Sequence, residues 1–362
     1  MAVGLPLKTT YADGDVYSAQ DVNDITGTIN ANVNPFVAGK NRIINGNFSV
    51  NQRAFSSSAN PADGTYTFDR WAVASAGGTR TYSLQAFTPG TAPVAGYEGT
   101  NFARTVTSGQ SGAGDYAAYY QRIEDVRTFA NSTVTISFWA KASTGTPKVG
   151  TSFDQRFGTG GSGTVTTSAG DVTISTSWAR YSVTKLVPSV SGKTIGANSD
   201  ITLFLFSSAG SSLFAYTAIG VQNATIDIWG VQVEQGSTAT AFQTATGTIQ
   251  GELAACQRYY IRLDNQTANS FTGFGRAYNT TFVESFVSLP VPMRIYPTSM
   301  DSSNLAINNS TVNYNSGTFA LNIYGQRNLI YVQYTHGSAV FTQSNMYNLT
   351  CVNGYIGFNA EL

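Results

Sequence analysis

Asp227-Ile-Trp-Gly-Val-Gln-Val-Glu-Gln-Gly-Ser-Thr-Ala-Thr-Ala-Phe242 is the stretch that decides the fold, and Glu252-Leu-Ala-Ala-Cys-Gln-Arg-Tyr-Tyr260 follows it. The first segment has the pattern of a buried strand and a turn, and the second has that of a helix. Ile226 and Ile228, before Trp229-Gly230, occupy even positions, whereas Val231 and Val233, after it, occupy odd positions. A β-bulge produces such a change, and glycine tolerates it. We therefore expect a bulged strand that is covered on both faces.

Residues 41–246 show the alternation of apolar and polar side chains that is typical of β-strands. Val134, Ile136 and Phe138 share one parity, and stretches rich in glycine, serine and threonine separate such segments. No helical pattern of useful length interrupts the series. Short strands in this arrangement favour an antiparallel sandwich, so we expect a mainly β fold with a jelly-roll β-sandwich over 41–246.

Residues 1–40 form a segment of their own, with a short helix. Ser18-Ala-Gln-Asp21 has the form of a helix start. The apolar side chains that follow, at helical spacing, are Val22, Ile25, Ile29 and Val33. So short a stripe is marginally stable alone, so we expect this helix to pack on copies of itself or on a larger body. The aspartates nearby lack the spacing and the closing glutamate of a calcium loop, and no metal site is predicted.

Residues 247–262 are predicted to form a helical neck. The apolar residues Ile249, Leu253, Cys256 and Tyr260 are spaced four, three and four residues apart. This is the seam pattern of a coiled coil, which predicts an oligomeric neck with Cys256 as a buried thiol. The same pattern also fits an amphipathic helix lying on the sandwich, and the sequence leaves both interpretations open.

Residues 263–362 return to short strand-like segments and predict a small C-terminal β domain, here called the tip. Tyrosine is frequent in it, and tyrosine offers a flat apolar surface with a polar group, which suits receptor surfaces and subunit packing alike. The residues predicted to contact a receptor or glycan are Tyr278, Tyr314, Tyr334 and His336. Periodicity does not decide which tyrosines are exposed, because apolar side chains occur on both parities.

The composition excludes several classes of partner. Charged residues make up 11% of the chain and the net charge is zero, so there is no basic run to bind a nucleic-acid backbone. No apolar run reaches the roughly 18 residues of a transmembrane helix, and the first residues lack the apolar core of a signal peptide. A neutral surface rich in amides and hydroxyls suits sugars, although it is also common in extracellular β proteins.

Catalysis has little support in the sequence. His336 is the single histidine, in a turn-like context, and the two cysteines, Cys256 and Cys351, form no metal or redox motif. Glu124 and Asp125 are the residue types of a glycosidase pair, but neighbours in a strand point to opposite faces. We therefore expect a protein that is not an enzyme and needs no cofactor.

Several motifs together resemble bacteriophage tail-fibre or virion appendage proteins that carry a jelly roll similar to carbohydrate-binding modules. They are Asn41-Arg-Ile-Ile-Asn-Gly-Asn-Phe48, Phe68-Asp-Arg-Trp71, Val134-Thr-Ile-Ser-Phe-Trp-Ala-Lys141, Val231-Gln-Val-Glu-Gln-Gly-Ser-Thr-Ala-Thr240, the stretch from Glu252 to Tyr260, Pro290-Val-Pro-Met-Arg-Ile-Tyr-Pro-Thr298 and the start Tyr11-Ala-Asp-Gly-Asp-Val-Tyr-Ser-Ala-Gln-Asp-Val-Asn23. Each motif is weak alone, but their order along the chain is fairly specific.

The resemblance implies a homotrimer in the virion, made in the host cytoplasm. Residues 1–40 would attach it to other virion proteins, and the distal β domains would bind a host-surface glycan or protein. Two alternatives remain at this point: a purely structural or decorating virion protein, and a glycan-degrading tail enzyme.

Overall fold

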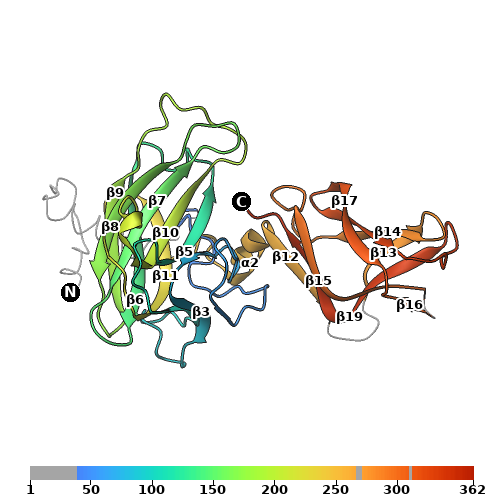
Figure 1. Ribbon diagram of the computed structural model, residues 1–362, viewed down its shortest axis with the longest axis horizontal. Helices are drawn as coiled ribbons and strands as arrows, with labels where there is room; N and C mark the ends of the chain where they lie inside the picture. Colours follow the sequence, from blue (N-terminus) through green and yellow to red (C-terminus); the bar gives the residue numbers. More distant parts are fainter. Residues whose placement is uncertain (1–38, 266–270, 310–311) are drawn as a thin grey trace, which may run out of the picture.

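The computed structural model describes residues 39–265, 271–309 and 312–362. Figure 1 shows a larger β-sandwich and a smaller β domain, with the helix α2 (Ile249–Gln257) between them. The described part is mainly β, as predicted, and besides α2 it has only the short 3-10 helix η1 (Ser211–Leu213). The predicted helix with Val22, Ile25, Ile29 and Val33 lies outside the described residues.

The sandwich consists of two antiparallel sheets. In spatial order the first contains β1 (Ser57–Ala59), β3 (Thr79–Ala86), β4 (Asn101–Ser108), β11 (Thr225–Gln235), β6 (Thr133–Ala142) and β9 (Ala179–Leu186). The second contains β2 (Ala72–Ala76), β5 (Tyr116–Glu124), β10 (Asp200–Ala209), β7 (Lys148–Arg156) and β8 (Val165–Thr173). The chain changes sheet between β4 and β5, again before β6 and again before β7, which is the winding of a jelly roll.

The central strand β11 has the predicted bulge. Its register against β6 shifts between Trp229 and Gln232, and Gly230 has φ of 63°. A Cβ atom at Gly230 would lie 2.7 Å from a ring carbon of Trp139, so only glycine fits this position. Trp229 and the valines after the bulge are fully buried. Both faces of the strand are therefore covered, as the parity change predicted.

The segment before β1 closes the sandwich over β11. The Asn41 side chain donates to the carbonyl oxygens of Val231 (3.1 Å) and Gln243 (3.0 Å), and it accepts from the amide of Val233 (3.0 Å). Trp71 donates from its indole nitrogen to the carbonyl oxygen of Asn45 (3.0 Å). Residues of three of the quoted motifs therefore meet around the bulge.

Helix α2 is shorter than the helical neck predicted for residues 247–262. The Thr248 hydroxyl accepts from the amide of Gly251 and caps the first turn. The helix ends at Gln257, and Tyr260 opens the strand β12 (Tyr260–Asn265) instead. The prediction of one helical seam through Tyr260 is therefore wrong at that residue, because Tyr260 pairs with Asn359 of β19 (Met346–Asn359).

The four predicted neck residues do not form one stripe. Cys256 and Tyr260 are buried within the chain, whereas Ile249 and Leu253 are 52% and 37% exposed. Both cysteines, Cys256 and Cys351, are buried free thiols. A contact between copies can therefore use only the exposed pair, and the oligomeric neck stays a prediction.

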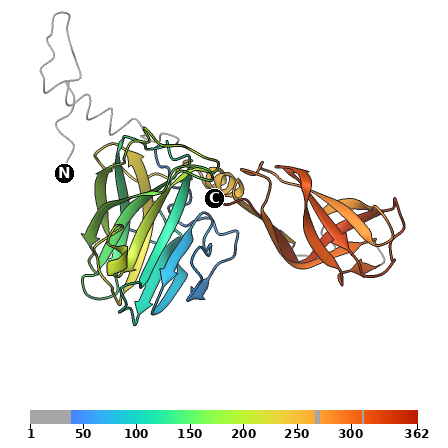
Figure 2. The same ribbon diagram turned by 45° about the horizontal axis from the view of Figure 1, so that its top comes forward.

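The tip is built on one antiparallel sheet of eight strands. Its path is β16 (Asn313–Tyr314), β15 (Ser299–Asn308), β19, β13 (Phe271–Ala277), β14 (Phe282–Ser288), β18 (Leu329–Thr335) and β17 (Thr318–Gln326), with β12 also pairing with β19. Figure 2 shows that the sheet is strongly curled. Apolar side chains on its inner face, such as Ile330, Leu349 and Phe358, form a core separate from that of the sandwich.

Candidate functional site

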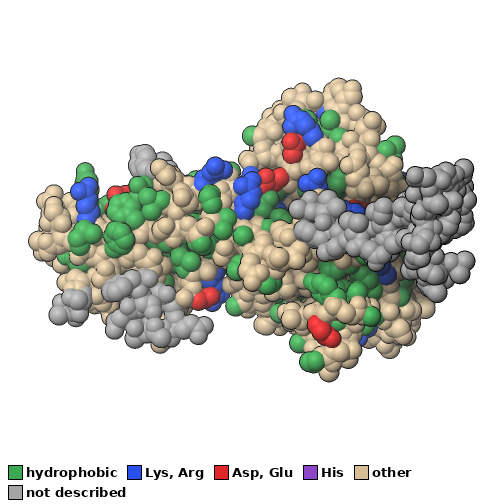
Figure 3. All heavy atoms as spheres, turned by 180° about the vertical axis from the view of Figure 1, so that it is seen from behind, with side chains coloured by type: hydrophobic (Ala, Val, Ile, Leu, Met, Phe, Trp, Pro, Cys, Tyr) green, Lys and Arg blue, Asp and Glu red, His purple; other side chains and the backbone are tan. Residues whose placement is uncertain are grey.

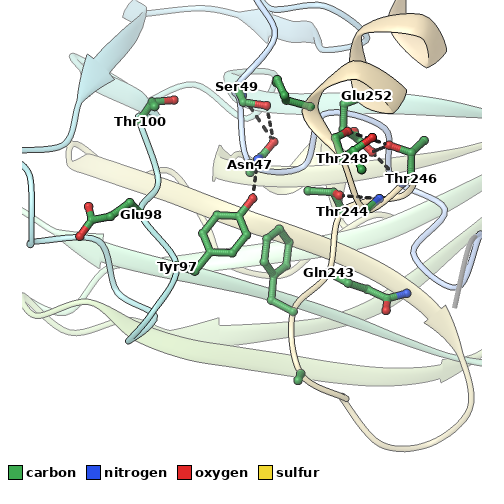
Figure 4. Close-up of a pocket in the computed structure, with 14 residues that line it drawn as sticks. Asn47, Ser49, Tyr97, Glu98, Thr100, Gln243, Thr244, Thr246, Thr248 and Glu252 are labelled. Atoms are coloured by element: carbon green, nitrogen blue, oxygen red, sulfur yellow. Dashed lines mark hydrogen bonds between the residues drawn. The ribbon is translucent and has the colours of Figure 1, made fainter. Parts of the chain in front are cut away.

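One hollow, here called the junction pocket, lies where the sandwich meets the chain that leads into α2 (Figure 4). Its volume is about 670 Å³. Three segments line it, one before β1, one between β3 and β4, and one from the end of β11 into α2. The lining residues are Asn47, Ser49, Tyr97, Glu98, Thr100, Ala241, Phe242, Gln243, Thr244, Thr246, Gly247, Thr248, Ile249 and Glu252.

One wall of the junction pocket is aromatic. The rings of Tyr97 and Phe242 meet edge to face with centroids 5.6 Å apart. Behind them lies Trp229, with centroids 5.4 Å from Tyr97 and 5.0 Å from Phe242. The bulge in β11 therefore fixes the position of this wall, because Trp229 is its first residue.

Uncharged polar groups form most of the remaining lining. The Asn47 amide donates to the Tyr97 hydroxyl oxygen (2.8 Å), and its carbonyl oxygen accepts from the Ser49 hydroxyl (2.9 Å). Burial raises the pKa of Tyr97, so its hydroxyl stays protonated at neutral pH. Among the described residues no acceptor is found for that proton, and the hydroxyl can donate it to a ligand.

The two carboxylates at the pocket differ in role. Glu252 is fully buried and accepts from the Asn45 amide (2.7 Å) and from the amide and hydroxyl of Thr246 (2.8 Å each). It thus fastens α2 to the sandwich. Glu98 is exposed and accepts from the amide of Gly90 (3.2 Å). Glycoside hydrolysis needs a proton donor and a base or nucleophile on either side of the bond, and an acid held by three fixed donors is poorly suited to either task.

Glu124 and Asp125, the acids that the sequence offered for catalysis, lie outside the junction pocket and are paired with other side chains. Glu124 accepts from Arg258 (3.0 Å) and from the Tyr259 hydroxyl (2.7 Å). Its neighbour Asp125 pairs with Arg127 at the surface (3.2 Å). The described residues therefore contain no free acid pair at this position. They also contain no cluster of histidine, cysteine and acidic side chains that could hold a metal ion.

Three of the four residues predicted to contact a receptor lie together in the tip. Tyr314 and Tyr334 both pack near His336, with ring centroids 6.2 and 6.3 Å away. Tyr334 is completely buried and His336 is partly covered, so Tyr334 supports the fold and does not meet a ligand itself. Tyr278 stands apart, is 61% exposed and contacts Phe282.

The junction pocket was not predicted as a site from the sequence, although some of its residues lie in the quoted motifs. Asn47 belongs to the motif that starts at Asn41, and Phe242 ends the stretch that decides the fold. A signal existed in the uncharged hydroxyl run from Thr244 to Thr248. Tyr97 carried no such signal, because it lies in the loop between β3 and β4, and only the folding of the sandwich brings that loop to the pocket.

Neutral side chains dominate the face of the molecule in Figure 3, where charged groups are scattered and no basic patch gathers. In the described part of the chain, no helix is long and apolar enough to cross a membrane.

Comparison with known proteins gave structural likenesses only. No protein-family model matches the chain, and a search of curated proteins found no match. A sugar-binding protein described as putative from Bacteroides thetaiotaomicron is 13% identical, with a TM-score of 0.35 over 54% of this chain and 100% of that chain. The CBM22-1 xylan-binding domain of Paenibacillus barcinonensis Xyn10C is 14% identical, with a TM-score of 0.29 over 51% and 99%.

The enzymatically active domain of tailspike protein 4 from bacteriophage CBA120 is 12% identical, with a TM-score of 0.31 over 54% of this chain and 22% of that chain. Likenesses this distant carry no conclusion about function. The function proposed next therefore rests on the geometry of the junction pocket.

Proposed function

We propose that this chain is a non-enzymatic, glycan-binding virion protein of the fibre or appendage type. The observation that supports it best is the junction pocket, in which an aromatic wall faces amide and hydroxyl groups. Sugars present C–H faces and many neutral hydroxyls, and such a lining matches both. Its one buried acid is already held by three hydrogen bonds, so the site favours binding over hydrolysis.

The virion part of the proposal rests on the sequence motifs. Residues 1–40 attach the chain to other virion proteins, and the exposed Ile249 and Leu253 of α2 form the contact of a homotrimer. These apolar side chains are exposed on a helix in which Glu252 and Cys256 are buried. The tip and the sandwich then face the host surface.

Glycan binding is tested with neutral hexasaccharides of glucose, mannose, galactose and N-acetylglucosamine, by calorimetry on the full chain. Replacing Tyr97 with Phe or Thr100 with Val removes one hydroxyl and keeps the shape, so either change should weaken the best ligand about 3- to 10-fold. Thr173→Val, at an exposed position of β8, is the matched control. Unchanged affinity in both pocket variants would refute the pocket as a glycan site.

The virion part has separate tests. Deleting residues 1–40 should give soluble protein that no longer joins particles, and native mass spectrometry of the full chain should show a trimer that Leu253→Asp dissociates. Incorporation of the shortened chain into particles would rule out the attachment role.

Firm attachment without binding to host cells or their glycans would favour the structural or decorating protein. Release of reducing sugar, lost on replacing one acid, would establish the glycan-degrading enzyme.

A further inference from the structure

A second hollow, here called the tip groove, lies between the two ends of the curled sheet of the tip. Its volume is about 580 Å³, and β15 with β16 forms one side while β17 forms the other. These strands are the two ends of the sheet path, so the groove lies where the two ends of the curled sheet approach each other without pairing. The lining residues are Ser302, Asn304, Leu305, Ala306, Asn313, Asn315 and Phe319.

The side chains of β16 and of the residue after it alternate in direction, and two amides line the groove. Asn313 and Asn315 line it and are exposed, whereas Tyr314 between them points the other way. The Tyr314 ring packs on Phe341 and Tyr347, with centroids 4.9 and 6.4 Å away. Tyr314 therefore anchors the strand, and its two neighbours are the groups that a ligand meets.

Hydrogen bonds fix the turn at Ser316 and Gly317, which follows Asn315. The Tyr334 hydroxyl accepts from the amide of Gly317 (2.9 Å), and the Nε2 atom of His336 lies 3.1 Å from the Ser316 hydroxyl. Tyr334 also supports Phe319, with ring centroids 4.6 Å apart. The aromatic residues predicted as contacts thus fix the wall of the groove.

The opposite side is shaped by an irregularity in the pairing of β15 with β19, where β19 has the additional residues. The register of β15 against β19 shifts between Ser303 and Leu305, and Asn304 has φ of 53°. At this shift the Asn304 amide donates to the carbonyl oxygen of Asn353 in β19 (3.3 Å). Leu305 and Ala306 are buried and form the floor.

We propose that the tip groove is a second saccharide-binding site, independent of the junction pocket. Its lining contains no Lys, Arg, Asp or Glu, so it suits neither phosphate groups nor metal ions. Each asparagine amide both donates and accepts hydrogen bonds, as sugar hydroxyls do. Phe319 supplies an aromatic surface for a sugar ring. The ligand class is a neutral oligosaccharide.

The test measures binding of the same neutral hexasaccharides to the full chain that carries Tyr97→Phe and Thr100→Val, which weaken the junction pocket. In this background the double change Asn313→Ala and Asn315→Ala should weaken the remaining binding at least about 10-fold, since it removes two hydrogen-bonding amides. Saturation-transfer NMR should show contact between the sugar and aromatic protons of Phe319, and Phe319→Leu should remove that signal.

The control is Asn345→Ala, an exposed asparagine of the tip outside the groove, which should change nothing. Equal affinity before and after the double asparagine change overturns the tip groove. The junction pocket is judged separately, by the effect of its own two variants in the otherwise unchanged chain. Failure of one site is therefore distinguishable from failure of the other.

Discussion

Arg70 and Glu361 form a buried ion pair that joins the sandwich to the segment following β19. The Arg70 side chain is 1% exposed and that of Glu361 is 4% exposed. Arg53 also pairs with Glu361 (3.3 Å), and the Arg70 guanidinium lies 3.4 Å from the ring centroid of Tyr259. A planar guanidinium between a carboxylate and an aromatic ring is a demanding arrangement that lysine does not reproduce.

Glu361→Ala should destabilise the protein by about 3–5 kcal/mol, because it leaves the Arg70 charge buried without its partner. The measurement is the free energy of unfolding in urea. The control is Arg127→Ala, which removes the exposed pair with Asp125 and should cost less than about 1 kcal/mol. Equal effects of the two changes would contradict the structural role assigned to the buried pair.

Glu124 should make stability depend on pH below the neutral range. Partial burial alone would raise the pKa of Glu124, but the hydrogen bonds from Tyr259 and Arg258 and the charge of Arg258 outweigh it, and the pKa is lowered from 4.5. Because the folded-state pKa lies below the unfolded value, this contribution is present above pH 4.5 and is lost as pH falls through the folded-state pKa.

The measurement compares the free energy of unfolding of the unchanged chain and of Glu124→Gln between neutral and acidic pH. The difference between the two proteins should shrink on acidification, since protonated glutamate and glutamine bond alike. A difference that stays constant would show that the charge of Glu124 does not contribute.

Gly230→Ala should destabilise the sandwich by about 2–4 kcal/mol. The positive φ alone costs an alanine about 1–2 kcal/mol, and the contact of its Cβ with Trp139 adds to this. Gly109→Ala is the matched control, because Gly109 has φ of 66° and open space around the Cβ position. Thermal unfolding of both variants separates backbone strain from the steric contact. Equal losses would mean that the packing on Trp139 has no effect.

Glu252→Ala should lower both stability and sugar binding. It leaves the buried amide of Asn45 without its acceptor and frees the Thr246 segment that lines the junction pocket. We expect a loss of about 3 kcal/mol or more, since hydrogen bonds to a charged group contribute about 1.5–3 kcal/mol each. Calorimetric unfolding together with the hexasaccharide titration checks this. Full stability with intact binding would contradict the fastening role of Glu252.

The sequence was sufficient for the features that depend on local pattern. Alternation predicted a jelly-roll sandwich, and the parity change at Gly230 predicted the bulge. The end of α2 could not be predicted, because Tyr260 leaves the helix to pair with Asn359, far along the chain. A long-range pairing of this kind overrides the helical pattern of the residues that it takes up.

The candidate site was harder to predict for a related reason. Tyr314 and Asn315 lie on opposite sides of a short segment, and composition favoured the tyrosine over the amide. The choice depends on which side faces the core, and apolar side chains occur on both parities of the tip strands. The packing of Tyr314 against Phe341 and Tyr347 turns the tyrosine toward the core and leaves Asn315 to the groove.

The joint also has a mechanical consequence. The chain enters the tip through Tyr259 and Tyr260, and its last strand, β19, returns beside them. After β19, Glu361 forms ion pairs with Arg70 and Arg53 of the sandwich. A body attached at a single point swivels, whereas one held at two neighbouring points resists torque about that junction. A pull on the tip is therefore transmitted to the sandwich through both connections, and the ion pair of Arg70 with Glu361 strengthens the second of them.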